Sequence, residues 1–141
     1  MKTILFALII LTTFVSGADL EGTWKLQSYS TIDQIKKSPA YLSADDVTRG
    51  AMDAQFDTML ENGQYSFGPG DTLHYTDIQG TMMVTRRALY AFSNDTLYIK
   101  EIDRAFEREA FVHQLSADSL VISPIVQGKV GNGKMVFTRA K

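Results

Sequence analysis

The chain has 141 residues, which is the length of one domain with room for a substantial core. It carries 14 basic and 16 acidic residues, for a formal net charge of −2, and no basic run stands out. This charge argues against a nucleic-acid partner. The chain has no cysteine, so disulfides are excluded and stability must come from a packed core.

Residues 1–18 have the layout of a secretory signal peptide. Lys2 supplies a positive charge, residues 4–14 form an apolar run, and residues 15–18 supply a cleavage site. The run is about half the ~20 residues needed to span a bilayer. We expect cleavage after Gly17 or Ala18, a mature domain over residues 19–141, and a periplasmic or secreted location. No cysteine is present to carry a lipid at the cleavage site, so we expect no membrane anchor after cleavage.

Residues 22–30 form the first predicted strand, and the stretch that follows, residues 30–54, lacks a strand pattern. Ser43, with Asp46 three residues later, is typical of a helix N-cap. We therefore expect a short helix in this first long loop. A loop of this length is often a lid or a binding segment. Disorder of the same stretch is the alternative.

From residue 56 onward, short alternating segments are separated by two-residue turns. Such a turn fixes the register, because residues that face each other across it share a face of the sheet. The strongest signal is Asn62-Gly63, which predicts a hairpin that places Leu60 opposite Tyr65, with Phe67 and then Phe56 further along the same apolar face.

Three further turns are predicted at residues 94–95, 117–118 and 132–133. The pairs that they predict are Phe92 with Leu97 and Tyr90 with Ile99; Leu115 with Leu120, His113 with Ile122 and Phe111 with Pro124; and Val130 with Met135 and Gly128 with Phe137. Each turn gives a largely apolar face, as a half-buried antiparallel sheet requires.

With a segment around residues 81–87, the count reaches about eight strands in up-and-down order. Consecutive hairpins with one apolar face favour a meander closed into a barrel, which leaves no exposed edge. The predicted fold class is therefore all-β, an antiparallel up-and-down barrel of about eight strands with a short helix or lid in the first long loop. An open sandwich is the alternative.

The first strand begins with Gly22-Thr23-Trp24, a G-x-W motif soon after the signal peptide. This start resembles the lipocalins, and residues 20–26 are similar to the short lipocalin-like proteins exported by Bacteroidota. The resemblance implies a calycin-type barrel whose last strand carries a basic residue across the tryptophan ring, and Arg139 stands at that place. Gly22, Trp24 and Arg139 would then form the base of the barrel. The central motif of the family has no clear match in this chain.

The interior of such a barrel is the candidate binding site. By the predicted register, the side chains that line it are Phe56, Tyr65, Phe67, Tyr90, Phe92, Phe111 and His113. The two tyrosines and His113 would be polar contacts, although His113 could also be a core histidine with satisfied nitrogens. The aromatic set could equally fill the barrel completely, since eight strands leave an interior just wide enough for side chains.

No motif for catalysis stands out. No G-x-S-x-G elbow frames a serine, and the two histidines lack metal-ligand spacing, so we expect no enzyme, no metal and no cofactor. We expect an exported protein that holds a small hydrophobic molecule in its barrel. The alternative is a filled barrel that acts through its surface, as a protease inhibitor or an envelope interaction module, with residues 30–54 as the interaction loop.

Overall fold

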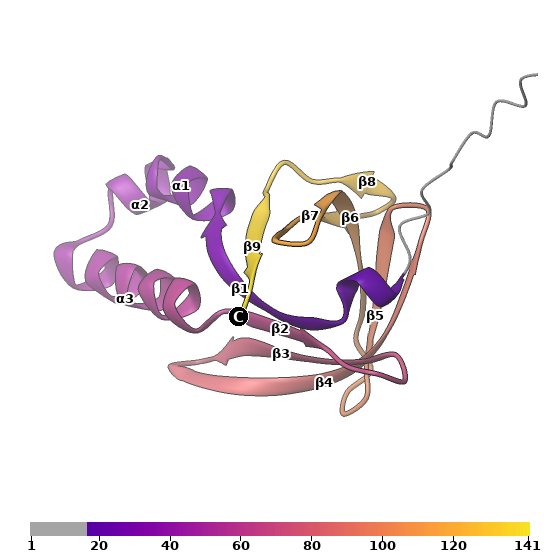
Figure 1. Cartoon of the computed structure of the whole chain (residues 1–141). Helices are drawn as coiled ribbons and strands as arrows, with labels where there is room; N and C mark the ends of the chain where they lie inside the picture. The colour runs from indigo at the N-terminus through magenta and orange to yellow at the C-terminus, as the bar shows by residue number, and fades with distance from the viewer. Residues whose placement is uncertain (1–16) are drawn as a thin grey trace, which may run out of the picture.

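The computed structural model describes residues 17–141; most of the predicted signal peptide, residues 1–16, lies outside them. The described residues form a closed antiparallel barrel of eight strands with helices at one end (Figure 1). The ring strands are β1 (Gly22–Tyr29), β2 (Gln64–Phe67), β3 (Thr72–Gln79), β4 (Met82–Ser93), β5 (Thr96–Glu101), β6 (Glu107–Leu115), β7 (Ser119–Val126) and β9 (Met135–Arg139). A two-residue strand, β8 (Lys129–Val130), is added to β7. The predicted fold class is confirmed.

The first and last strands close the ring. β1 pairs with β9, which sets Trp24 opposite Arg139 and Leu26 opposite Phe137. β9 also pairs with β7, and β7 with β6, so no ring strand is left with a free edge over its whole length. Closure of this kind removes the unpaired backbone groups that would otherwise template aggregation.

The hairpin predicted at residues 94–95 is confirmed together with its register. Phe92 faces Leu97 and Tyr90 faces Ile99. Asn94 and Asp95 have φ angles of 51° and 58°, the backbone that a two-residue turn of this twist requires and that Asn and Asp tolerate.

The turn at residues 117–118 is also present, but the register beyond it differs from the prediction. Leu115 faces Leu120 as expected, whereas a bulge between Val112 and Gln114 shifts the pairing by one residue. A one-residue shift reverses the face of every side chain beyond it. Val112 therefore points inward opposite Ile122, and the predictions that Phe111 and His113 face the interior were wrong.

The prediction of a hairpin at residues 132–133 was wrong as well. The tight turn lies instead at Gln127 and Gly128, whose φ angles are 52° and 74°, and it joins β7 to β8. The chain then crosses to β9, so Phe137 faces Leu120 rather than Gly128. Gly133 lies where a Cβ would come within 2.1 Å of the Thr31 hydroxyl, so it is required for a close approach and not for a turn.

The largest difference from the prediction is at Asn62-Gly63, which ends a helix and does not form a hairpin. Three helices separate β1 from β2: α1 (Ser30–Lys36), α2 (Pro39–Leu42) and α3 (Asp46–Asn62). The expected helix in the first long loop is thus present, but it begins at the N-cap Asp45, whose side chain accepts from the Thr48 amide at 2.7 Å, and not at Ser43. Phe56 lies on α3, so its predicted place on a barrel strand was wrong.

The two ends of the barrel differ. The 3-10 helix η1 (Gly17–Leu20) lies at one end, and the helices α1, α2 and α3 project from the other (Figure 1). The interior nearer η1 is closely packed: Leu20, Trp24, Leu73, Leu97 and Phe137 have no exposed surface. We refer to these ends as the base and the helical end.

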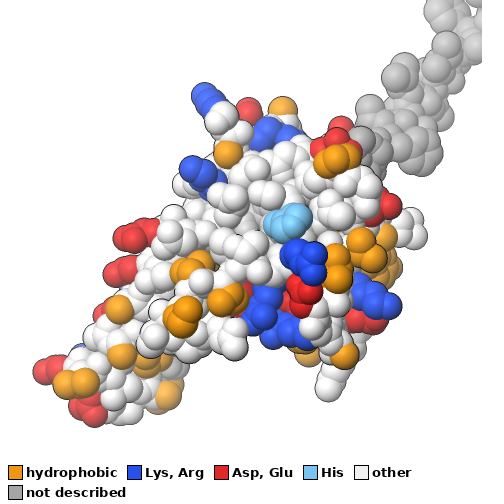
Figure 2. Space-filling view, turned by 90° about the horizontal axis from the view of Figure 1, so that it is seen from below, with side chains coloured by type: hydrophobic (Ala, Val, Ile, Leu, Met, Phe, Trp, Pro, Cys, Tyr) orange, Lys and Arg blue, Asp and Glu red, His pale blue; other side chains and the backbone are white. Residues whose placement is uncertain are grey.

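The surface shows no patch of a single charge on the face drawn in Figure 2, where basic and acidic side chains lie beside one another. Arg87 and Asp103, both more than half exposed, form a surface ion pair at 2.6 Å. Among the helices of residues 17–141, none combines the length and the apolar character needed to cross a bilayer.

Candidate ligand-binding site

The base of the barrel is closed by Arg139 and Trp24. The guanidinium carbon lies 4.2 Å from the indole centroid, a cation–π contact worth on the order of 1 kcal/mol. The indole N–H donates to the Leu20 carbonyl at 2.9 Å, so the buried ring has no unsatisfied donor. Gly22 has a φ of +123°, and a Cβ there would come within 2.7 Å of Arg139, which explains the glycine of the G-x-W motif.

Arg139 also ties η1 to the barrel. It donates to the carbonyls of Asp19, Glu21 and Ala117 at 2.8, 2.5 and 2.7 Å. All three guanidinium nitrogens thus have backbone partners. These hydrogen bonds close the base by linking η1, β9 and the loop between β6 and β7.

The middle of the interior is filled by aromatic side chains. Phe67 meets Tyr90 edge-on, with ring centroids 4.9 Å apart, and both are buried. Phe92, further along β4, is partly buried against the same core. Three of the predicted lining residues therefore face the interior but pack into the core, so this part of the barrel is filled.

A cavity of about 180 Å³ remains at the helical end. Its wall is mostly apolar, and residues from β1, β2, β3, β4, β6, β9 and the end of α3 contribute to it. They include Leu26, Tyr29, Met59, Tyr65, Tyr75, Met83, Arg108, Met135 and Phe137. An apolar wall with a few converging polar groups is the usual form of a small-molecule site.

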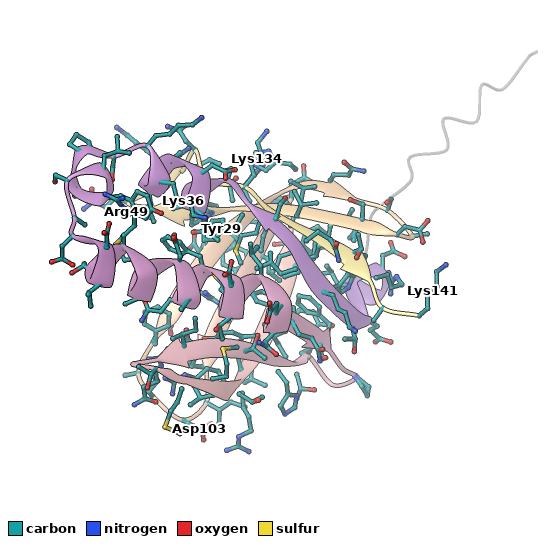
Figure 3. The ribbon with its side chains drawn as sticks, turned by 90° about the vertical axis from the view of Figure 1, so that its left-hand side faces the viewer. Tyr29, Lys36, Arg49, Asp103, Lys134 and Lys141 are labelled. Atoms are coloured by element: carbon teal, nitrogen blue, oxygen red, sulfur yellow. The ribbon has the colours of Figure 1, made fainter. Side chains whose placement is uncertain are left out.

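Helix α3 covers this cavity with its last turns alone. Met59 lines the cavity, and Met59 and Leu60 pack against the core, yet no residue of α3 is fully buried. The rest of the helix contacts α1 and α2: Lys36 pairs with Asp53 at 3.7 Å, and the Tyr41 hydroxyl donates to Asp53 at 2.7 Å. Figure 3 shows Tyr29 and Lys36 in the space between α1 and α3.

A buried carboxylate holds the polar side of the cavity. The Glu101 side chain is 1% exposed, receives a short hydrogen bond from the Tyr75 hydroxyl, and pairs with Arg104. The hydrogen bond from Arg104, aided by that from Tyr75, keeps the pKa of Glu101 below its ordinary value against the opposing effect of burial. Burial and the hydrogen bond to Glu101 raise the pKa of Tyr75 to about 12, so Tyr75 remains a phenol.

Asp77 is the second carboxylate of this network. It pairs with Arg86 at 3.3 Å and with Arg104 at 3.5 Å. Tyr75 and Arg86 occupy facing positions on β3 and β4 and so share the inner face of the barrel. The two carboxylates therefore engage two of the three arginines at this end.

Arg108 is the third arginine. It lies on β6 at an inward position in line with Ala110 and Val112. Its guanidinium carbon lies 4.4 Å from the Tyr75 ring centroid and 5.7 Å from that of Tyr65, and its Nη2 donates to the Tyr65 hydroxyl at 2.7 Å. Its Nε is buried and has no hydrogen-bond partner in the described part of the chain.

Of the side chains proposed from the sequence, Tyr65 alone lines this cavity. Phe56 lies on α3 beneath Lys36, whose amine is 5.8 Å from its ring centroid. Phe111 and His113 lie on the outer face of β6 with their rings 4.9 Å apart. His113 Nε2 is 2.7 Å from the Ser123 hydroxyl, but Ser123 is fully buried and cannot reach a substrate.

Arg108, Tyr75 and Glu101 were missed by the sequence reasoning. Arg108, Ala110 and Val112 alternate with period two. A correct assignment of the inward positions on β6 would therefore have placed a charged residue, Arg108, on the inner face of the barrel. The bulge after Val112 concealed this alternation. Tyr75 lies on β3, a segment to which the sequence reasoning assigned no strand.

A second hollow, of about 590 Å³, lies against β4, β5, β6 and the β7–β8 turn, with outward side chains such as Leu89, Tyr98 and Lys100 on its wall. It lies on the outer side of the sheet, and Arg108 of β6 is the residue that it shares with the wall of the cavity beneath α3. Within residues 17–141, no group of three or more His, Asp or Glu side chains is placed to hold a metal ion.

Comparison with solved structures places this geometry among known folds. A lipocalin-like protein from Bacteroides uniformis superposes with a TM-score of 0.52 at 17% identity, covering 86% of this chain and 99% of that one. The chain has a lipocalin-like fold. A DUF4847 family protein from Bacteroides vulgatus superposes on this lipocalin-like barrel with a TM-score of 0.51 at 16% identity, covering 86% and 94%. No protein-family model and no curated protein matches the sequence.

Proposed function

We propose that this lipocalin-like barrel is an exported binding protein that holds one small, largely apolar molecule beneath α3. The cavity of about 180 Å³ at the helical end supports the proposal, because its wall is apolar and its polar groups converge. A lipocalin-like fold suggests ligand binding in general. We propose a binding role without catalysis, since Ser123, the serine that meets a histidine, has no exposed surface.

The cavity volume limits the size of the ligand. An engineered apolar cavity of about 150 Å³ in another protein holds benzene, and drug-sized ligands occupy about 300–1,000 Å³. The volume here therefore favours a molecule with about the bulk of a benzene ring or a short alkyl chain. Retinoids and haem are too large for it.

Filling the cavity tests the proposal. Met59→Trp inserts a larger side chain from α3, while Met82→Trp makes the same change at a position that is 67% exposed and outside the cavity wall. We expect M59W to weaken binding of hexan-1-ol, benzyl alcohol, hexanoate or benzoate by at least about tenfold, and M82W to leave it unchanged. Isothermal titration calorimetry measures both.

Two results would count against the proposal. Binding that survives M59W would place the ligand elsewhere, and the lack of saturable binding to all four probes in the unaltered protein would favour a filled barrel that acts through its surface. That barrel would then work as an inhibitor or an envelope interaction module.

We further propose that the protein acts in the periplasm or outside the cell after removal of residues 1–17 or 1–18. Either cleavage keeps the two backbone acceptors that lie in η1, the Asp19 carbonyl for Arg139 and the Leu20 carbonyl for Trp24. N-terminal sequencing of the exported protein should read Ala18 or Asp19 first. A chain that still begins at Met1 would refute this.

A further inference from the structure

The charges at the helical end of the barrel do not balance. Arg86, Arg104 and Arg108 face two carboxylates, those of Asp77 and Glu101. Asp77 pairs with Arg86 and Arg104, and Glu101 pairs with Arg104. No carboxylate of the described residues lies within ion-pairing distance of Arg108. Of these three arginines, Arg108 is therefore the one whose guanidinium has no carboxylate partner.

Arg108 cannot release its positive charge, because arginine stays protonated in proteins. The two tyrosine rings beside it offer a partial substitute for a counter-ion through their π faces. They leave its Nε–H buried and without an acceptor. Buried charges in proteins are normally paired and their donors satisfied, so this arrangement is incomplete without a further group.

The missing acceptor belongs in the cavity. Arg108 and Tyr65 both line it, beside the apolar side chains of Leu26, Met135 and Phe137. The Tyr65 hydroxyl accepts from Arg108, and its own hydrogen has no acceptor among the described residues. Burial raises the pKa of Tyr65, so this hydroxyl keeps its hydrogen. One cationic N–H and one O–H thus remain available at the polar side of an apolar pocket.

We propose that the ligand held beneath α3 is a compact apolar monocarboxylate, whose carboxylate accepts from the Arg108 Nε–H and the Tyr65 hydroxyl. This inference rests on the proposed function and specifies the chemistry of its ligand. A single negative charge balances the single excess guanidinium. A dianion such as a phosphate monoester would leave a net negative charge beside Asp77, which also lines the cavity. Hydrogen bonds between a guanidinium and a carboxylate are among the strong ones.

Matched pairs of probes test the proposal on the unaltered protein. Hexanoate and hexan-1-ol share an alkyl body, as benzoate and benzyl alcohol share a ring, and within each pair only the carboxylates carry charge. We expect each carboxylate to bind at least about tenfold more tightly than its alcohol in calorimetric titrations at pH 7. Hexyl phosphate should bind more weakly than hexanoate.

Substitution of the arginine assigns this preference to one side chain. In Arg108→Met the carboxylate and alcohol should bind equally, with alcohol binding retained. Arg87→Met is the matched control, because Arg87 lies on the outer face of β4 and is more than half exposed. It should keep the full preference. Arg108→Lys, which retains a positive charge, should keep part of it and serves if R108M fails to fold.

The outcomes separate this inference from the proposed function. Equal affinity for acid and alcohol in the unaltered protein would overturn the carboxylate and leave the binding cavity standing. No saturable binding of any probe would overturn both. A carboxylate preference that persists in R108M, or that keeps its full size in R108K, would assign the anion to another residue and overturn the role of Arg108.

Discussion

Two arginines lie over aromatic rings at opposite ends of the barrel, and their hydrogen bonds give them different roles. Arg139 covers Trp24 and donates from all three of its nitrogens to backbone carbonyls. Arg108 covers Tyr75 and leaves one buried donor without a partner. A saturated guanidinium holds structure together, whereas an unsaturated one in a cavity wall is available for a ligand.

Glu101 gives a prediction at the same scale. Its carboxylate pairs with Arg104, and this holds the pKa of Glu101 below the 4.5 of a free side chain. A depressed folded-state pKa means that the stabilisation is complete above about pH 4.5 and is lost as the pH falls through the folded value. Glu101→Gln should therefore lower the free energy of unfolding by about 1–3 kcal/mol at pH 7 and flatten its decline in acid.

Urea unfolding at pH 7 and at pH 3 measures both effects. Glu107→Gln is the control, because Glu107 is 73% exposed and its pairing with Lys100 spans 3.8 Å. It should follow the unaltered protein at both pH values. An E101Q variant whose unfolding free energy falls as steeply in acid as that of the unaltered protein would contradict the assignment.

Individual residue positions could be predicted from the sequence where a motif or a turn fixed them. The meeting of Trp24 and Arg139 was foreseen, because the G-x-W start and closure of the ring fix it without any detail of the middle strands. His113 was expected on the inner face of β6 and lies on the outer one, because one bulge in β6 shifts the register that the turn predicts. A bulge is decided by the pairing of two distant strands, and the turn residues do not encode it.

At the scale of elements, α3 is the segment in which a strand was expected and a helix formed. Phe56, Thr58 and Leu60 alternate as a strand would, but Met52, Phe56, Met59 and Leu60 also recur at helical spacing. Asn62-Gly63 suits a hairpin turn and the end of a helix equally. The N-cap at Asp45 begins the helix and lets it run through the ambiguous segment.

Because residues 56–61 form part of a helix and not a strand, the proposed site lies at the helical end of the barrel, beneath α3. Had residues 56–61 formed a strand, Phe56 would have filled the interior and the helical end would have been walled by sheet. As a helix, α3 lies outside the ring and touches it chiefly through its last turns, so it can cover a cavity without filling it. A covering element with so few buried contacts belongs to the less stable part of a fold.

At the scale of the whole molecule, the closed ring was predictable because hairpin order and alternation both point to it. The cavity was not, since its volume depends on how about a dozen side chains from seven elements pack together. The sequence left open a completely filled barrel and a barrel with a binding cavity, and the structure contains both arrangements in different parts of one barrel. The base and middle are filled, and the helical end is hollow.

The central claim is that the ligand binds beneath α3 at the helical end, and mapping of amide chemical shifts tests it most directly. Titration with hexanoate and with hexan-1-ol should shift the backbone amides of Gly63, Tyr65 and Met135, which line the cavity and not the outer hollow, and leave the Trp24 indole N–H at the base unmoved. Shifts centred on Tyr98 and the outer hollow, or on the Trp24 indole, would contradict the account.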